Sequence, residues 1–217
     1  MITQLIAVGR EIVDAGLVRG SGGNLSARRG VEMWITRSGA DLGQLTGADF
    51  VPASLAPQTV VNQNGPRPSS ELAMHRAAYA ARPATQVVLH VHPLRAISLG
   101  LVGKEMPAFT PDFYLHLGPC VPLVPYLTPT TDTLAAAVGV ALAQAPAALL
   151  QNHGVIVVGE TAAQALLRLF LLEEHAGIYL TALSAGTPRL LTTQEQRDLD
   201  EITGGRYRIN HSGTEIK

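Results

Sequence analysis

The stretch Thr85-Gln86-Val87-Val88-Leu89-His90-Val91-His92-Pro93 predicts a buried β-strand with two histidines at its carboxyl end. Pro93 ends the strand because proline lacks a backbone N–H, and it suits the start of a short helix, expected over residues 94–101. Successive side chains of a strand point to opposite faces, so His90 and His92 share a face and could chelate one metal ion. A pair of strand histidines is more often hydrogen-bonded or half-exposed than metal-bound, so a site needs further ligands.

Two further residues supply such ligands. His153 lies in a turn, Gln151-Asn152-His153-Gly154, between apolar strands expected over 147–151 and 155–158, which is an unusual place for a core residue. Glu71 adds a carboxylate. Three histidines and a carboxylate that can leave the ion are typical of a catalytic metal site, because the departing carboxylate opens a position for substrate. Zinc is the expected ion, although cobalt or manganese would also accept these ligands.

His75 follows Glu71 by four residues, so both can lie on one face of a helix. Two interpretations of His75 are open at this point. It is either a core residue in a simple contact with Glu71, or a residue that orients the Glu71 carboxylate.

The rest of the chain alternates between helical and strand patterns with short joints. We therefore expect one α/β domain over residues 1–217, with a polar C-terminal tail from about residue 187. Further helices are expected over 2–15, 71–81 with an N-cap from Ser69 or Ser70, 132–145 with an N-cap from Thr131, and 161–183. Further strands are expected near Asn24–Ser26, over 31–36 as its hairpin partner, over 59–61 before a turn at Asn64-Gly65, and over 121–124.

Composition excludes several classes of protein. The chain has 217 residues, of which 47% are hydrophobic and 15% charged, so it can bury a large core. Its net charge of −1 argues against nucleic acid or an anionic membrane as the main partner. Cys120 is the single cysteine, which rules out an intrachain disulfide and an all-cysteine zinc site. We see neither a secretion signal nor an apolar run of ~20 residues, and expect a cytoplasmic protein without a membrane span.

Three short, donor-rich turns could together bind an anion. They are Gly22-Gly23-Asn24, Ser38-Gly39 and Ser69-Ser70, the last of which opens a helix whose N-terminus carries partial positive charge. Each turn alone is common loop chemistry. Together they predict a phosphate site, and because no Walker A or dinucleotide fingerprint is present, a nucleotide cofactor is not indicated.

Five motifs in this order resemble the class II aldolase/adducin family over about residues 1–185. The motifs are Gly22-Gly23-Asn24-Leu25-Ser26, Ile35-Thr36-Arg37-Ser38-Gly39, Pro68-Ser69-Ser70-Glu71 with His75, His90-Val91-His92-Pro93 and Gln151-Asn152-His153-Gly154. The resemblance implies a three-layer α/β/α fold around a mainly antiparallel central sheet. It also implies a homotetramer with active sites between neighbouring subunits.

The resemblance also implies roles for single residues. His90, His92 and His153 correspond to zinc ligands, and Glu71 to a residue that both contacts the metal and acts as acid and base. The phosphate cradle would comprise Gly23, Asn24, Ser38, Gly39, Ser69 and Ser70. The implied activity is that of a lyase that cleaves a small phosphorylated ketose, such as fuculose 1-phosphate, to dihydroxyacetone phosphate and an aldehyde.

A second acid or base must act on the far hydroxyl of such a substrate, and the sequence offers three candidates. The family's aldolases use a tyrosine and its 4-epimerases an aspartate in a similar loop, and Thr110-Pro111-Asp112-Phe113-Tyr114 contains both Asp112 and Tyr114. Tyr114 is the first candidate, and Tyr207 in the tail is a third. The family also includes methylthioribulose-1-phosphate dehydratases, decarboxylases of phosphorylated sugar acids, and adducin-like interaction modules that lack the metal ligands.

Overall fold

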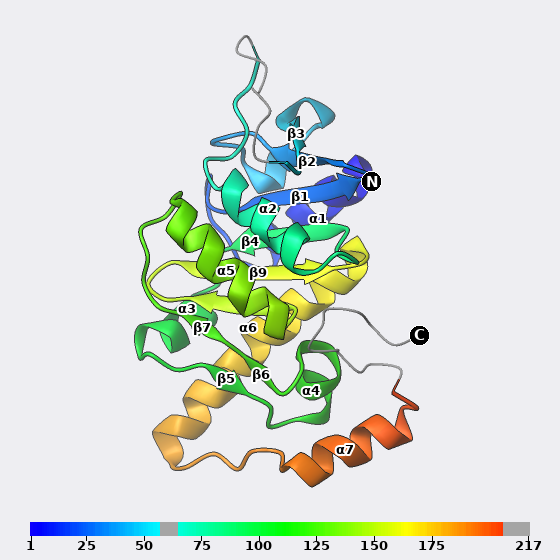
Figure 1. The fold of residues 1–217 in the computed structure, drawn as a ribbon. Coiled ribbons are helices and arrows are strands. Elements are labelled where there is room, and N and C mark those ends of the chain that lie inside the picture. The colour runs from blue at the N-terminus through cyan, green and yellow to red at the C-terminus, as the bar shows by residue number, and fades with distance from the viewer. Residues whose placement is uncertain (57–64, 206–217) are drawn as a thin grey trace.

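The computed structural model describes residues 1–56 and 65–205, and its centre is a seven-stranded sheet in the order β3-β2-β1-β4-β9-β8-β7 (Figure 1). Every neighbouring pair of strands is antiparallel except β7 and β8, which run parallel. The strands are β1 (Asn24–Arg29), β2 (Glu32–Thr36), β3 (Phe50–Ser54), β4 (Val87–Val91), β7 (Leu123–Val124), β8 (Ala147–Leu150) and β9 (Gly154–Gly159). The expected mainly antiparallel sheet is confirmed.

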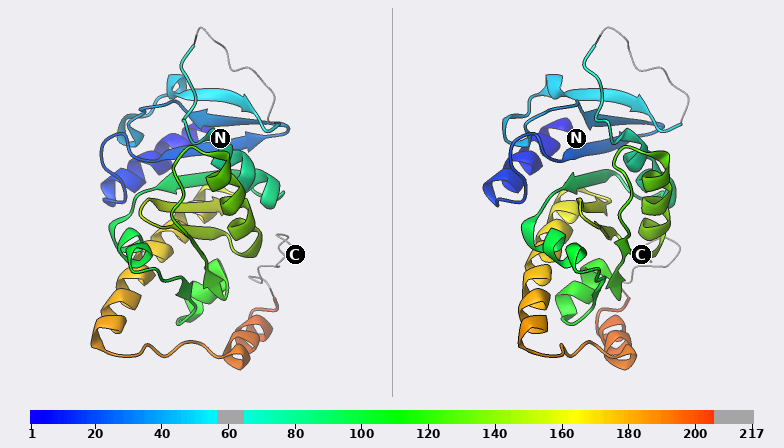
Figure 2. Two further views of the ribbon diagram at one scale, coloured as in Figure 1. Left: turned by 60° about the vertical axis from the view of Figure 1, so that its left-hand side comes forward. Right: turned by 90° about the vertical axis from the view of Figure 1, so that its left-hand side faces the viewer.

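Helices cover both faces of the sheet and complete three layers (Figures 1 and 2). One apolar core lies between the sheet and α1 (Ile2–Asp14), α3 (Leu94–Leu101), α4 (Pro111–Leu117) and α6 (Ala162–Ala185). A second core lies between the other face and the helices α2 (Leu72–Ala81) and α5 (Asp132–Gln144). Two 3-10 turns, η1 (Leu42–Gln44) and η2 (Gly47–Asp49), connect β2 to β3.

The strand β4, which carries the histidine motif, lies in the middle of the sheet. All five of its residues are buried, because β1 and β9 flank it and helices cover both faces. Such a strand has no solvent-facing side, which explains why its sequence is apolar on both faces except at His90.

Most of the predicted helices and strands agree with the structure to within a few residues, and Thr131 caps α5 as expected by accepting a hydrogen bond from Leu134 N (3.2 Å). The cap of α2 differs from the prediction, because Glu71 is the N-cap residue and makes no side-chain cap bond. Ser69 Oγ instead accepts from the Glu71 backbone N–H (3.3 Å).

The single strand expected over 121–124 is wrong. It is divided into β6 (Cys120–Val121), which pairs with β5 (Met106–Pro107) in a separate two-stranded sheet, and β7 in the main sheet. Pro122 stands between them, and proline lacks the N–H that a continuous ladder requires. The strand β3 and the helix α4 were not predicted, nor was the helix α7 (Thr193–Ile202) within the polar tail. The strand predicted over 59–61 and Asn64 of the predicted turn lie outside the described residues.

Across residues 1–56 and 65–205, none of the helices combines the length and apolar character needed to cross a lipid bilayer.

Candidate metal centre

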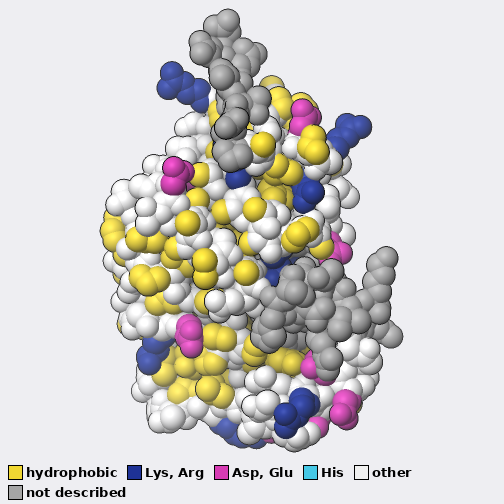
Figure 3. Space-filling view, viewed as in Figure 1, with side chains coloured by type: hydrophobic (Ala, Val, Ile, Leu, Met, Phe, Trp, Pro, Cys, Tyr) yellow, Lys and Arg dark blue, Asp and Glu magenta, His cyan; other side chains and the backbone are white. Residues whose placement is uncertain are grey.

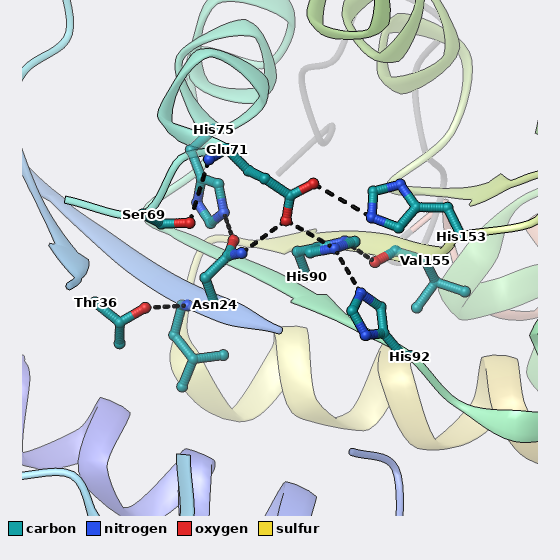
Figure 4. Close-up of polar contacts among 10 residues, drawn as sticks. Asn24, Thr36, Ser69, Glu71, His75, His90, His92, His153 and Val155 are labelled. Carbon is teal, nitrogen blue, oxygen red and sulfur yellow. Dashed lines mark hydrogen bonds and ion pairs between the residues drawn. The ribbon is translucent and has the colours of Figure 1, made fainter. Parts of the chain in front are cut away.

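The register of the central strands positions the histidine cluster. His90 lies opposite Asn24 of β1 on one side and opposite Ile156 of β9 on the other. His153 lies in the turn that precedes β9, where Asn152 adopts a left-handed φ of 56° and the chain reverses tightly. The turn thereby places His153 beside the end of β4, next to His90 and His92 (Figure 4).

The three histidines offer nitrogen atoms that lie within 4.8 Å of one another. The Nδ1–H of His90 donates to the carbonyl of Val155 (2.9 Å), so its Nε2 carries a lone pair in the neutral imidazole. That Nε2 is 3.1 Å from the Nε2 of His92. Burial, with smaller contributions from His90 and His153, lowers the pKa of His92 to about 4, so His92 is neutral at neutral pH.

Glu71 faces the same point from the start of α2. Its Oε2 is 3.1 Å from His90 Nε2, and its Oε1 is 3.3 Å from His153 Nε2. Burial alone would raise the pKa of Glu71, but its polar contacts with His153, His90 and Asn24 outweigh it and hold that pKa far below its usual range. The carboxylate is therefore ionised among nitrogen lone pairs.

This arrangement fits a divalent cation. Lone pairs of His90 Nε2 and Glu71 Oε2 face each other at 3.1 Å, and Glu71 Oε1 is buried without a hydrogen-bond partner among the described residues. Four ligands bound tetrahedrally to zinc at 2.0–2.1 Å would be separated from one another by roughly 3.3 Å. The contacts of His90 with His92 and Glu71 (3.1 Å) and of Glu71 with His153 (3.3 Å) are close to this spacing, and the histidine nitrogens as a group lie within 4.8 Å. A cation at their centre would turn a repulsive group of acceptors into a set of ligands.

Two glycines permit the close approach of the backbone to this cluster. A Cβ on Gly154 would lie 2.5 Å from the Val91 carbonyl oxygen and 2.6 Å from His92 Cδ2. A Cβ on Gly23 would lie 2.6 Å from the His90 carbonyl oxygen, and Gly23 also has a positive φ of 77°. Any larger residue at either position would push the strand or the histidines away.

The three predicted anion-binding turns gather near Glu71. An isolated antiparallel bridge joins Arg37 to Pro68, and Ser38 N donates to Arg67 O (2.9 Å), so the Ser38-Gly39 turn lies beside the Ser69-Ser70 turn. In the same region Ser69 N donates to Thr36 O (3.0 Å). Asn24 Nδ2 donates to Glu71 Oε2 (2.9 Å), which brings the Gly22–Asn24 turn to the same carboxylate.

Comparison with known proteins gives this arrangement a family. The family model of the class II aldolase and adducin N-terminal domain matches residues 3–180. The chain belongs to the class II aldolase/adducin family. The resemblance found in its motifs is thereby confirmed.

Relatives within this family have different activities. The chain is 31% identical to L-fuculose phosphate aldolase of Escherichia coli (strain K12), over 89% of the chain and 88% of the relative. It is also 30% identical to 3-oxo-tetronate 4-phosphate decarboxylase of Cupriavidus necator, over 82% of each protein. A solved structure of L-fuculose 1-phosphate aldolase superposes with a TM-score of 0.85 at 29% identity, covering 93% of this chain and 95% of the other.

The candidates for the distal acid or base lie apart from the histidines within this class II aldolase fold. Tyr114 lies on α4, and its hydroxyl donates to Asp200 Oδ2 (3.1 Å) on α7. Asp112 is exposed in the first turn of α4. Both helices lie at the end of the molecule away from β1 and β2 (Figure 1). Tyr207 lies outside the described residues.

Sequence reasoning missed two polar residues that connect to the centre. Ser26 Oγ contacts both His75 Nδ1 (2.7 Å) and the Tyr79 hydroxyl (2.9 Å), and all three side chains are buried. A signal was present, because Ser26 follows Asn24 by two residues in a strand, and Tyr79 follows His75 by four in a helix. Only the packing of α2 against β1 shows that the two pairs face each other.

Proposed function

We propose that this protein is a zinc-dependent aldolase that cleaves a small phosphorylated ketose, such as fuculose 1-phosphate, to dihydroxyacetone phosphate and an aldehyde. The observation that carries the proposal is the joint presence of a three-histidine cluster with an ionised glutamate and, beside it, three donor-rich turns. The 31% identity to L-fuculose phosphate aldolase over most of both chains supports the same activity.

His90, His92 and His153 would hold the metal, with Glu71 as a fourth ligand that substrate displaces. Zinc is the expected ion because nitrogen ligands with one oxygen ligand suit it, and cobalt or manganese would serve as replacements. Bound zinc would supply Lewis-acid stabilisation of the negative charge that develops on the substrate when the carbon–carbon bond breaks.

Glu71 would move the proton on the reacting carbon. In the direction of cleavage, the C3–C4 bond of the ketose phosphate breaks, its electron pair stays with the C3 fragment, and a proton leaves the C4 hydroxyl. C3 then gains one proton, so the reaction needs no outside oxidant or reductant. Because the pKa of Glu71 is held low, its resting form is the base that removes the same proton in the direction of condensation.

The phosphate group would lie among Gly23, Ser38, Gly39, Ser69 and Ser70. Ser70 is exposed just before α2, and Ser38 and Gly39 are exposed in the turn after β2 that the Arg37–Pro68 bridge brings beside it. Backbone N–H groups and the positive end of the helix favour an anion there. Asn24 belongs to the same group by family resemblance; one N–H of its side-chain amide donates to Glu71 and its oxygen accepts from His75, which leaves the second N–H for the phosphate.

The distal acid or base would come from Tyr114, with Asp112 and Tyr207 as alternatives. A Y114F variant that loses turnover while keeping metal affinity would support Tyr114. If D112N loses turnover and Y114F does not, the role passes to the aspartate.

The test is to incubate zinc-loaded protein with a panel of ketose 1-phosphates and to detect dihydroxyacetone phosphate with a coupled reduction. We expect cleavage by the wild type and at least a hundredfold loss in E71Q, since a general base contributes about 10²–10⁴-fold. The H92A variant serves as the metal-deficient control. An epimer or a dehydrated ketone as product, or no turnover of any ketose phosphate, would refute the aldolase proposal.

A second candidate is decarboxylation of a phosphorylated 3-oxo acid at the same site. It is favoured by the 30% identity to 3-oxo-tetronate 4-phosphate decarboxylase over 82% of both proteins. Both reactions break a carbon–carbon bond and leave negative charge on the remaining phosphorylated fragment, so the same cluster of histidines and Glu71 would serve either reaction. Release of carbon dioxide from such an acid, without cleavage of ketose phosphates, would select this candidate.

We also propose that the protein is a homotetramer with active sites between neighbouring subunits. Large apolar side chains are exposed on and next to α3 and α6, including Leu94, Leu101, Val102 and Ile178. The face shown in Figure 3 also carries apolar surface with few charges among it. Light scattering coupled to gel filtration would measure the mass, and L94E is expected to lower it if this surface is an interface.

A further inference from the structure

A chain of four buried hydrogen bonds leads from Tyr79 to the carboxylate of Glu71. Tyr79 OH contacts Ser26 Oγ (2.9 Å), and Ser26 Oγ contacts His75 Nδ1 (2.7 Å). His75 Nε2 contacts Asn24 Oδ1 (2.5 Å), and Asn24 Nδ2 donates to Glu71 Oε2 (2.9 Å). All five side chains are buried, and the part that includes Asn24, Glu71 and His75 is visible in Figure 4.

This chain of hydrogen bonds forms because two residues of β1 face two residues of α2. Asn24 and Ser26 lie two residues apart on β1 and therefore point to the same face of the sheet. His75 and Tyr79 lie four residues apart on α2 and therefore share a helix face. The hydrogen bonds cross between β1 and α2 repeatedly, so the chain also holds the start of α2 against the sheet.

The direction of every bond in the chain follows from the carboxylate. An ionised carboxylate only accepts, so the amide nitrogen of Asn24 faces Glu71 and its oxygen faces His75. The oxygen also only accepts, so His75 carries its proton on Nε2. Burial, with a smaller effect of His90, lowers the pKa of His75 to about 3, so the ring is neutral and its Nδ1 accepts. Ser26 then donates to His75, and Tyr79 donates to Ser26.

We propose that Asn24, His75, Ser26 and Tyr79 are positioning residues that hold Glu71 by Oε2 and leave Oε1 as the oxygen that exchanges the proton with substrate. This inference rests on the proposed lyase function for its catalytic meaning. It is supported by the contrast between the two oxygens, because Oε2 receives the Asn24 bond at 2.9 Å, whereas Oε1 makes no hydrogen bond among the described residues and has only the ion-pair contact with His153 Nε2 at 3.3 Å. A carboxylate held at one oxygen keeps the other aimed when substrate displaces it from the metal.

The chain of hydrogen bonds would position Glu71 and would not conduct protons to it. Passing a proton from His75 to Glu71 would require the Asn24 amide to become an imidic acid, which is a strongly unfavourable tautomer. The hydrogen bonds would therefore fix the orientation of the Glu71 carboxylate and nothing more. Asn24 uses one of its two amide N–H groups for Glu71 and its oxygen for His75, so the second N–H makes this positioning role compatible with a place in the proposed phosphate cradle.

The test compares H75L with H75Q. Glutamine can place its amide N–H near the position of His75 Nε2 and restore the bond to Asn24, whereas leucine cannot. We expect H75L to lower kcat by about 10–100-fold with a much smaller change in KM, and H75Q to recover most of the loss. The variant S26A removes the next bond along the chain and should show a smaller loss in the same direction.

A second readout does not require turnover. Cobalt bound in place of zinc absorbs visible light according to its ligand geometry, so the substrate-free spectrum reports on how Glu71 is held. We expect the spectrum to change in H75L and to return in H75Q. The matched control is H175L, which removes a buried histidine bonded to Thr110 outside the cluster and should leave the cobalt spectrum unchanged whatever it costs in stability.

The outcomes separate the two proposals. If wild-type protein cleaves no ketose phosphate, the aldolase proposal fails, and the cobalt spectra still test the positioning chain. If H75L fails to fold, S26A carries the comparison. The positioning proposal is overturned if H75L or S26A keeps the wild-type spectrum and kcat, or if H75Q is no closer to wild type than H75L.

Discussion

Replacement of Gly154 by alanine tests how tightly the backbone is packed against the candidate metal centre. Gly154 opens β9 and is buried between the end of β4 and the histidine rings. An added methyl would lie 2.5 Å from the Val91 carbonyl oxygen and 2.6 Å from His92 Cδ2. Both contacts are roughly 1 Å shorter than the 3.5–4.0 Å at which such atoms attract.

Two responses can relieve this overlap, and both are costly. The Val91 carbonyl belongs to the central strand, so moving it disturbs the pairing of β4 with β9. The His92 ring can rotate, but it then leaves the cluster. We therefore expect G154A to lose about 1–3 kcal/mol of unfolding free energy, the usual cost of overpacking. We also expect its zinc affinity to fall at least about tenfold, or ~1.4 kcal/mol.

The matched control is G139A, the same chemical change in helix α5. A methyl at Gly139 would lie 3.7 Å from Ala77 Cβ, an ordinary contact. Alanine favours a helix over glycine by about 0.5–1 kcal/mol, so G139A should be more stable than wild type. Urea titrations of the metal-free variants, all at the same protein concentration, would show opposite shifts of the unfolding midpoint. The midpoint should fall by about 1 M urea for G154A and rise for G139A. Wild-type stability and zinc affinity in G154A would refute the packing argument.

Three further predictions concern the metal, the cysteine and a helix cap. Zinc added after chelation at 100 times its Kd should stabilise wild-type protein by about 2.7 kcal/mol in thermal melts, and it should raise the melting temperature of H92A far less. Burial, with Glu105 nearby, raises the pKa of the Cys120 thiol to about 12. Alkylation of this thiol should therefore be slow at pH 8, and its rate should rise about tenfold per pH unit. Fast labelling at pH 8 would contradict this prediction. The variant T131A should lose about 1 kcal/mol of stability in urea with an unchanged m value, because the cap bond to Leu134 N disappears.

The central part of the fold could be predicted because its signals are local. The apolar run before His90, the proline after His92 and the threonine before α5 each determine structure within a few residues. The division of residues 120–124 between two sheets was also readable from Pro122, although the apolar run around it indicated one strand. Helix α4 carried a comparable signal, a threonine N-cap followed by proline at its first position.

The helix α7 and the positioning chain could not be predicted in the same way. The helix is strongly polar, so its pattern indicates a tail unless the Thr192–Glu195 capping box is recognised. The bond between Ser26 and His75 depends on how far β1 and α2 are shifted along each other. That shift is set by tertiary packing across 49 residues of sequence and leaves no local trace.

The four candidate ligands differ in how the fold holds them. His90 is bonded to the neighbouring strand through the carbonyl of Val155. His92 directly precedes Pro93 and α3, and the start of α3 is held by Glu173, whose buried carboxylate accepts from Arg95 N (3.0 Å) and Ala96 N (2.9 Å). Glu71, in contrast, begins a helix and is held through the side chain of Asn24. A carboxylate fixed through one side-chain bond can leave an ion at lower cost than a histidine on a paired strand such as His90. We therefore expect the carboxylate to be the ligand that substrate displaces, and under the proposed positioning role the hydrogen bonds behind Asn24 would determine where that carboxylate lies after it has moved.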